Sequence, residues 1–241
     1  MAGVDGERLR QRAADLVREV CQHTTRPAPL IVEAGCGARS HLAHPPEAHI
    51  LGLDLSRSQL RRNDVVRWRL EGDVTRLPLA TGCADAAVSW DVLEHVPHPD
   101  AALAELARIV RPGGLIVLGV PNVVSAKGLV TRFTPWWFHV WVYRRVLGDA
   151  TAGTEASDQF PTSMSLGLRQ AGLRRRATAL GLEIVALEAY EGPVPLHFRR
   201  RHRVGNWTLT ALGWLSRAAS LGRYDATASD LVAVLRRPET S

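Results

Sequence analysis

Residues 30–37 read Leu-Ile-Val-Glu-Ala-Gly-Cys-Gly, a short apolar run followed by an acid and by two glycines one residue apart. The run is typical of a buried strand, and the glycines indicate a tight turn that lets the backbone approach a ligand closely. A second apolar run, Ile50–Leu53, ends in Asp54. Ligands of open parallel sheets bind beyond the carboxyl ends of the strands. The two stretches therefore predict an adenosine-containing cofactor at this edge, with Asp54 accepting hydrogen bonds from the ribose hydroxyls.

Strands and helices are expected to alternate along the chain. Apolar residues at helical spacing predict an N-terminal helix over residues 5–23. The patterns that follow predict strands at 30–34, 49–54, 66–71, 86–90 and 114–120, with helices near 39–44, 56–62 and 99–110. A further helix is expected over 163–180, and the final two strands at 182–190 and 230–236. This order is typical of an α/β fold with a doubly wound, Rossmann-like sheet.

Two classes of adenosine-containing cofactor fit the glycine loop, and the spacing of the loop separates them. The dinucleotide fingerprint is G-x-G-x-x-G, but Ser40 stands where its third glycine belongs, so the fit to NAD is poor. The alternative loop, E/D-x-G-x-G-x-G, is that of class I S-adenosylmethionine (SAM) methyltransferases. Glu33, Gly35 and Gly37 match this loop, and Arg39 replaces its third glycine.

Three further motifs follow the loop in a characteristic order. Gly72–Val74 follows a strand-like run, Asp85–Val96 spans a strand and the turn after it, and Arg111–Leu118 contains the Arg-Pro-Gly-Gly entry to another strand. In order and spacing they resemble the methyltransferase type 11 domain of the ubiquinone-biosynthesis O-methyltransferase type. The resemblance covers roughly residues 28–122 and extends more loosely through the C-terminal strands.

The resemblance implies one SAM-dependent methyltransferase domain over residues 1–241. Its core is expected at about 28–122, and the C-terminal helix and edge strands at 163–241. The sheet is expected to be mostly parallel with an antiparallel last strand. Between these parts, aromatic residues crowd a segment at about 122–162, with four of them and His139 between Trp136 and Trp141. This segment is interpreted as a helical lid over an apolar or ring-bearing substrate, or else as a satellite core that covers the sheet edge.

The same resemblance assigns a role to each residue of the cofactor site. Gly35, Cys36 and Gly37 should contact the methionine part of SAM through their backbone, and Glu33 should orient that loop. Asp54 should bind the ribose hydroxyls. The remaining expected positions are Leu55 on the adenine ring, Asp73 on the adenine amino group, Val74 as a backbone donor to the ring, and Trp90 through a carbonyl that receives the SAM ammonium.

Two histidines are candidate bases for deprotonating an acceptor. His95 follows the fourth predicted strand, where acceptors meet the methyl group in this family, although a structural histidine is the alternative. His139 is the second candidate. Asp91, Glu94 and His95 also align with a divalent-metal set of ubiquinone O-methyltransferases. Glu94 can instead cap a helix or bind an arginine, and no metal is predicted.

Composition bears on the partners and the cellular location of the protein. The formal charge is +6 with a single lysine, but the arginines are scattered and no nucleic-acid-binding module is present, so a nucleic-acid partner is not expected. No apolar run reaches the length of a membrane span, and the N-terminus lacks a signal-peptide pattern. Three widely spaced cysteines (Cys21, Cys36, Cys83) are interpreted as reduced thiols of a cytoplasmic protein.

A basic segment, 197–223, interrupts the C-terminal pattern. Arg199–Arg203 precede a helix whose face carries Trp207, Trp214 and Leu215. Such a helix beside basic residues can lie on an anionic membrane. Packing on the protein itself or on a second subunit is the simpler interpretation, so both peripheral membrane contact and homo-oligomerisation stay open.

The sequence is compatible with three functions. The first is SAM-dependent methyl transfer to a small molecule, most readily at oxygen, with nitrogen or carbon of a lipid or other apolar acceptor as variants. The second is a module that binds SAM or S-adenosylhomocysteine without catalysis. The third, a nicotinamide-linked oxidoreductase, is disfavoured by Ser40 and by the Arg-Pro-Gly-Gly strand entry. Cofactor site and fold do not fix the acceptor.

Overall fold

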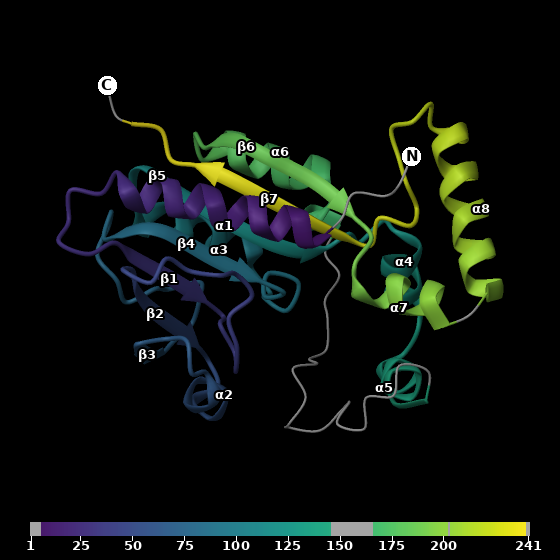
Figure 1. The fold of residues 1–241 in the computed structure, drawn as a ribbon, viewed down its shortest axis with the longest axis horizontal. Coiled ribbons are helices and arrows are strands. Elements are labelled where there is room, and N and C mark those ends of the chain that lie inside the picture. Colours follow the sequence, from purple (N-terminus) through teal and green to yellow (C-terminus); the bar gives the residue numbers. More distant parts are fainter. Residues whose placement is uncertain (1–5, 146–165, 202, 240–241) are drawn as a thin grey trace.

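The computed structural model describes residues 6–145, 166–201 and 203–239. Its centre is a seven-stranded sheet in the order β3-β2-β1-β4-β5-β7-β6 (Figure 1). All neighbouring strands pair in parallel except β7, which runs antiparallel to both β5 and β6. The predicted Rossmann-like sheet with an antiparallel last strand is confirmed. The strands are β1 (Leu30–Ala34), β2 (His49–Asp54), β3 (Trp68–Glu71), β4 (Ala84–Trp90), β5 (Val110–Pro121), β6 (Glu183–Tyr190) and β7 (Asp230–Arg236).

Helices cover both faces of the sheet. One face packs against α1 (Gly6–Gln22) and α2 (Arg57–Arg62), and the other against α3 (Pro99–Ile109) and α6 (Gln170–Ala179). The central strand β4 is buried at all seven positions because both of its faces are covered. Its side chains alternate between the two cores, with Ala87 in the α3 and α6 core and Val88 in the α1 and α2 core. The amphipathic pattern of α1 therefore matches the face that it buries.

One expected helix is absent. Residues 39–44 were predicted to be helical, but they belong to an irregular connection between β1 and β2. Pro45 and Pro46 follow directly, and a residue before proline is pushed out of the helical region. The side chains of Ser40 and His44 also bind Glu33, which holds the segment against the end of β1.

Other boundaries moved by a few residues. Strand β5 begins at Val110 rather than at residue 114, and β4 begins two residues earlier than expected. The helix expected over 163–180 is a 3₁₀ turn, η1 (Leu166–Leu168), followed by α6, while residues 163–165 lie outside the described part of the chain. The basic segment 197–223 holds parts of two helices instead of one.

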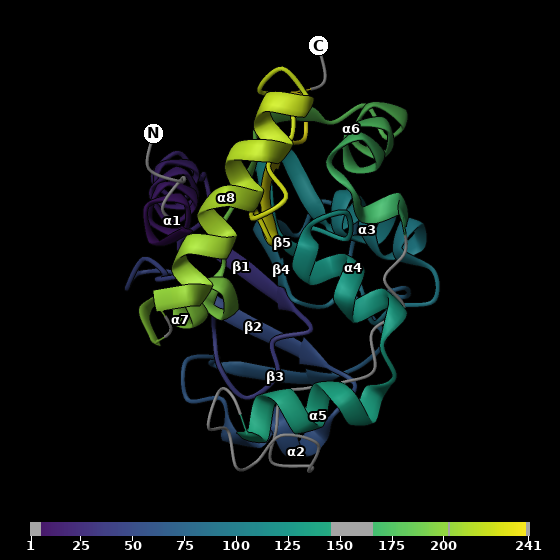
Figure 2. The ribbon, with the colours of Figure 1, turned by 90° about the vertical axis from the view of Figure 1, so that its right-hand side faces the viewer.

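Four helices lie beyond the carboxyl ends of the parallel strands. They are α4 (Ala126–Phe133), α5 (Trp136–Arg145), α7 (Pro193–Arg201) and α8 (Arg203–Ala219). Figure 1 shows them on one side of the molecule, and Figure 2 shows them facing the viewer in front of the strand ends. Within the described residues, no helix combines the length and the apolar character that crossing a bilayer requires.

Candidate cofactor site

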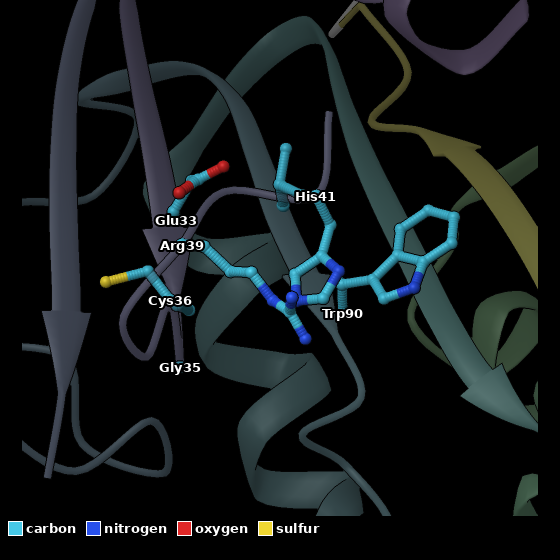
Figure 3. A pocket seen from close by; sticks show the side chains of 8 residues that line it. Glu33, Gly35, Cys36, Arg39, His41 and Trp90 are labelled. Carbon is cyan, nitrogen blue, oxygen red and sulfur yellow. The ribbon is translucent and has the colours of Figure 1, made fainter. Parts of the chain in front are cut away.

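The order of the strands fixes where a ligand can bind. The chain runs outward from β1 to β2 and β3, and then returns to place β4 on the other side of β1. The crevice between the carboxyl ends of β1 and β4 is therefore the topological switch point, where doubly wound sheets bind their ligands. A small pocket lies at this point (Figure 3). It is lined by Glu33, Ala34, Gly35, Cys36, Arg39, His41, Val88 and Trp90, four of which are predicted cofactor residues.

The glycine loop leaves β1 in a conformation that favours glycine. Gly35 and Gly37 have φ angles of 76° and 52°, in the left-handed region. The backbone N–H groups of Gly35 and Cys36 both donate to the carbonyl of Leu53, at 2.6 and 3.1 Å, which ties the loop to the end of β2. A Cβ at position 35 would lie only 2.4 Å from a methyl carbon of Val92. Position 35 therefore excludes a side chain on two grounds, φ and space.

Glu33 holds the segment that follows the loop. Its carboxylate is buried and accepts a hydrogen bond from the Ser40 hydroxyl at 2.5 Å and contacts His44 Nε2 at 2.6 Å. Asn63, which is fully buried, donates from Nδ2 to the carbonyls of Cys36 and Gly37, both at 3.4 Å. Ser40, His44 and Asn63 were not predicted to be part of the site. No periodicity marks them, because their contacts arise only when distant segments meet.

Asp54 stands at the tip of β2 beside the glycine loop. Its Oδ2 accepts from the Gly37 N–H at 2.9 Å, and its Oδ1 accepts from the Ser56 N–H at 2.8 Å. A carboxylate has about four acceptor positions, so two remain for hydroxyl donors. The neighbouring Leu55 side chain is 72% exposed, although it is a large apolar group. The geometry suits a ribose diol on Asp54 with an apolar ring on Leu55.

Asp73 and Val74 lie one strand further along the same edge. Glu71 at the end of β3 is in register with Asp54, and the Gly72 N–H donates to the Asp54 carbonyl at 3.0 Å. Asp73 Oδ1 accepts from the Thr75 N–H at 2.8 Å, and this bond lowers the pKa of Asp73. The Val74 side chain is buried in the core, so only its backbone is available for the predicted role.

Trp90 ends β4 and forms a wall of the pocket. Its side chain is only 5% exposed, the His41 ring stacks on it with centroids 6.1 Å apart, and the Arg10 guanidinium lies 5.3 Å from the ring centroid. Figure 3 shows the His41 and Arg39 side chains extending from the loop into the same pocket. The indole is thus engaged with protein, so the predicted contact of the Trp90 carbonyl with a ligand would use the backbone and stays a prediction.

The residues suit SAM in chemistry, but the pocket needs to open. The space at the switch point is about 10 Å³, room for roughly one water molecule. Arg39 and His41 occupy the pocket at the position where the loop pattern of this cofactor class has its third glycine, or close to it. We therefore expect these two side chains to move when a cofactor enters, while the loop backbone is already held in place.

A turn carrying the candidate base follows β4. Asp91 has a φ of 55°, uncommon for a residue other than glycine, and its N–H donates to the Gly119 carbonyl at 2.9 Å. Glu94 is buried, and His95 Nε2 lies 3.9 Å from Glu94 Oε1, with 24% of the His95 side chain exposed. Val92, in the same turn, faces Gly35. The turn and the glycine loop therefore lie against each other.

The carboxyl groups of this turn have raised pKa values. Burial, reinforced by the charge of Asp91, raises the pKa of Glu94 well above its ordinary value. The Asp91 side chain reaches solvent, yet desolvation by the surrounding protein and the charge of Asp230 raise its pKa. Asp230 itself accepts from Lys127 Nζ at 3.3 Å. A carboxylate with a raised pKa is a stronger base than an ordinary one.

Other candidates contribute less to the site. Within the described residues no three His, Cys, Asp or Glu side chains gather closely enough to hold a metal ion, Asp91, Glu94 and His95 included. The backbone of His139 lies in α5, but its side chain lies outside the described part of the structure. Burial raises the pKa of the Cys36 thiol to about 12, so this loop residue is a neutral thiol and a poor nucleophile.

Comparison with known proteins agrees with this geometry. Residues 32–118 match the sequence family described as "Methyltransferase domain". The match begins inside β1 and ends inside β5, so it contains the glycine loop, Asp54 and the turn after β4. One relative is named as a probable SAM-dependent methyltransferase, and a solved structure of similar fold holds S-adenosyl-L-homocysteine.

Individual relatives show how far the similarity extends. A "Probable S-adenosylmethionine-dependent methyltransferase" of Mycolicibacterium smegmatis is 26% identical over 167 residues, covering 64% of this chain and 63% of that protein. A malonyl-[acyl-carrier protein] O-methyltransferase of Laribacter hongkongensis is 34% identical over 147 residues, covering 51% and 50%. The alignments thus span less than two thirds of either relative.

A solved structure shows that the fold similarity reaches beyond the methyltransferase domain itself. The geranyl diphosphate C-methyltransferase of Streptomyces coelicolor A3(2), in complex with Mg²⁺, geranyl diphosphate and S-adenosyl-L-homocysteine, superimposes with a TM-score of 0.52. The alignment covers 96% of this chain and 80% of that one, at 13% identity. At this identity the comparison supports the fold alone, including β6 and β7.

Proposed function

We propose that this protein transfers the methyl group of SAM to an oxygen atom of a small, apolar or aromatic molecule. One observation carries the proposal. The glycine loop, the Asp54 carboxylate and the turn bearing His95 converge at the switch point of the sheet, inside the matched methyltransferase domain. The choice of oxygen is supported by a relative named as an O-methyltransferase at 34% identity. The finer resemblance to the ubiquinone type, and a cytoplasmic location, stay predictions.

Different residues of the chain bind different parts of SAM. When bound, SAM supplies a methyl group on a sulfonium that is discharged by in-line displacement. Asp54 binds the ribose hydroxyls with its two remaining acceptor positions, and Leu55 covers the adenine. The glycine loop presents backbone groups to the methionine part, and Glu33 keeps the loop in position through Ser40 and His44.

The turn after β4 prepares the acceptor. His95 is partly exposed at the carboxyl edge and removes the proton of an acceptor hydroxyl. Asp91 is the second candidate for this role, because desolvation raises its pKa and its side chain reaches solvent. Holding the acceptor oxygen in line with the reacting methyl group accounts for much of the rate in reactions of this type.

The direct test is methyl transfer to a panel of acceptors. Purified protein would be incubated with SAM labelled in the methyl group and with phenols, carboxylic acids, alcohols and amines. We expect labelled product from at least one oxygen acceptor and equimolar S-adenosylhomocysteine. SAM binding without transfer to any acceptor in the panel or in a cell extract would contradict the proposal and favour a binding protein.

Variants of the turn test the candidate bases. His95→Ala should lower turnover by about 10²–10⁴-fold if His95 is the base, while the dissociation constant for SAM changes little. His98→Ala is the matched control, because His98 is an exposed histidine three residues away. Asp91→Asn keeps the shape and tolerates the left-handed backbone. A loss in this variant with normal turnover in His95→Ala would move the role to Asp91.

A further inference from the structure

Helix α8 is packed with its small residues inward. A Cβ on Gly205 would lie 2.5 Å from a ring carbon of Phe198, and one on Gly213 would lie 3.3 Å from Thr227. On the same side, the Ser216 hydroxyl accepts from the Ala226 N–H at 3.0 Å. Arg217 at the C-terminal end pairs with Asp225. These contacts fix which side of α8 meets the rest of the protein.

The opposite side of α8 is apolar and exposed. Trp207, Trp214 and Leu215 recur at helical spacing and are 73%, 69% and 57% exposed. Leu221, just after the helix, is 85% exposed. The sequence made packing on the protein or on a second subunit the simpler expectation for this helix. Within the single chain, this face of α8 does not pack on the protein. Large apolar groups clustered on a surface usually mark an interaction site.

Exposed apolar residues also occur on other helices at the same edge of the sheet. On α4 and α5 these residues are Leu129, Val130, Phe133, Trp137 and Trp141, between 43% and 77% exposed. Figures 1 and 2 both place α4, α5 and α8 beyond the carboxyl ends of the strands. We call the exposed residues of α4, α5, α7 and α8 the edge surface.

The charged side chains of these four helices are all basic. The four helices contain nine arginines and lysines and no aspartate or glutamate, although the whole chain has 24 acidic residues. Lys127, Arg199 and Arg217 form ion pairs with acidic residues of neighbouring loops and strands. Arg145, Arg200 and Arg201 are among the exposed ones.

The exposed apolar groups and the basic charge together indicate what kind of partner covers the edge surface. A second copy of the chain would place two positive surfaces against each other. A nucleic acid would attract the arginines but would leave Leu215, Leu221 and Phe133 in water. A bilayer with anionic headgroups would both attract the basic residues and take the apolar side chains out of water. Tryptophans and leucines enter the interface, and basic residues near the surface are attracted to the anionic headgroups.

We propose that the edge surface docks the protein on a bilayer that contains anionic lipids. The contact is peripheral, with α8 lying along the membrane plane and the tryptophans at headgroup level. The proposal does not depend on the methylated substrate, because it rests only on the exposure and charge of these helices.

Vesicle flotation tests the proposal. The purified chain would be mixed with phosphatidylcholine vesicles, with or without 30% phosphatidylglycerol, at low and high salt. We expect binding to the anionic vesicles, at least tenfold weaker binding to the neutral ones, and a marked loss in high salt. Tryptophan fluorescence should shift to the blue and be quenched by brominated lipid. Equal binding to both vesicle types, or to neither, would overturn the proposal.

Variants separate the edge surface from other effects. The triple variant Trp207→Ser, Trp214→Ser, Leu215→Ser should reduce vesicle binding at least tenfold while leaving SAM binding and the melting temperature unchanged, because these side chains are exposed. Leu180→Ser removes an exposed leucine elsewhere and is the matched control. Unchanged vesicle binding in the triple variant, or its conversion of a wild-type dimer into a monomer, would contradict membrane docking.

Discussion

The Asp54 carboxylate joins three parts of the candidate site. It holds the glycine loop through Gly37 and the segment leading to α2 through Ser56, and it faces the position expected for a ribose. Such a group is optimally placed before any ligand arrives, so little ordering is needed on binding. Its two contacts also mean that removing it affects the loop as well as the ligand.

We expect Asp54→Ala to weaken SAM binding at least tenfold, which corresponds to about 1.4 kcal/mol. The SAM affinity of Asp54→Asn should lie between those of Asp54→Ala and the wild type, because one acceptor oxygen remains. Calorimetric titration measures both. Asp64→Ala, which removes an exposed carboxylate outside the site, is the control. Unchanged SAM affinity in Asp54→Ala would refute the ribose assignment.

Glu94 gives the stability of the protein a specific dependence on pH. Its folded-state pKa is raised, so the folded protein keeps this proton where the unfolded chain has already released it. Stability is therefore expected to fall as pH rises from about the ordinary carboxyl value toward the raised folded value. Glu94→Gln mimics the protonated carboxyl group, so the stability of this variant should not fall with pH in this way.

The melting temperature of Glu94→Gln should exceed that of the wild type at pH 8 and approach it near pH 4.5. A rise of one in pKa corresponds to about 1.4 kcal/mol, and a protein of this size melts about 2–4 °C higher per kcal/mol. Glu19→Gln, at an exposed position of α1, should show no such trend. A difference of the same size at both pH values would show that ionisation of Glu94 is not its cause.

At the residue scale, the sequence was most informative where a pattern is local. Glu33, Gly35 and Gly37 stand next to one another in the chain, so their spacing revealed the loop and the departure at Arg39. Ser40, His44 and Asn63 could not be found in this way. Their hydrogen bonds join segments separated by up to 27 residues, and nothing in their local composition indicates a partner.

At the scale of elements, apolar runs predicted all seven strands. The signal is strongest for the central parallel strands β1 and β4, because strands buried on both faces are continuously hydrophobic. The failures came where tertiary contacts outweigh local preference. Residues 39–44 do not form the predicted helix, because Ser40 and His44 bind Glu33 and because Pro45 and Pro46 disfavour helical backbone in the residues before them. Helix α8 was recognised, but its buried side was not, since glycine and serine contacts seat it and its tryptophans face outward.

The connection from β1 into the glycine loop gives a matched pair of substitutions. Gly35→Ala should destabilise the fold by about 1–2 kcal/mol from the left-handed backbone and by roughly 1–3 kcal/mol more from overlap with Val92. Gly37→Ala should cost only the backbone part, because nothing lies within 4 Å of a Cβ there. Urea unfolding measures both, and equal losses would contradict this account of the loop.

At the scale of the whole molecule, the reversal of strand order between β1 and β4 determines where the candidate cofactor site lies. The carboxyl ends of β1 and β4 diverge there, and the methyltransferase match covers both strands. The acceptor could not be predicted, because fold and cofactor loop are shared by enzymes with different substrates. The helices at the carboxyl edge add a basic, aromatic surface that lies outside the residues matched by the methyltransferase family.

We infer that the switch-point pocket binds SAM once Arg39 and His41 have moved. Calorimetric titration of the purified chain with SAM, S-adenosylhomocysteine and NAD in parallel tests it most directly. We predict dissociation constants in the micromolar range for SAM and S-adenosylhomocysteine and no binding of NAD. Binding of NAD, or no heat with either SAM or its product, would contradict the account.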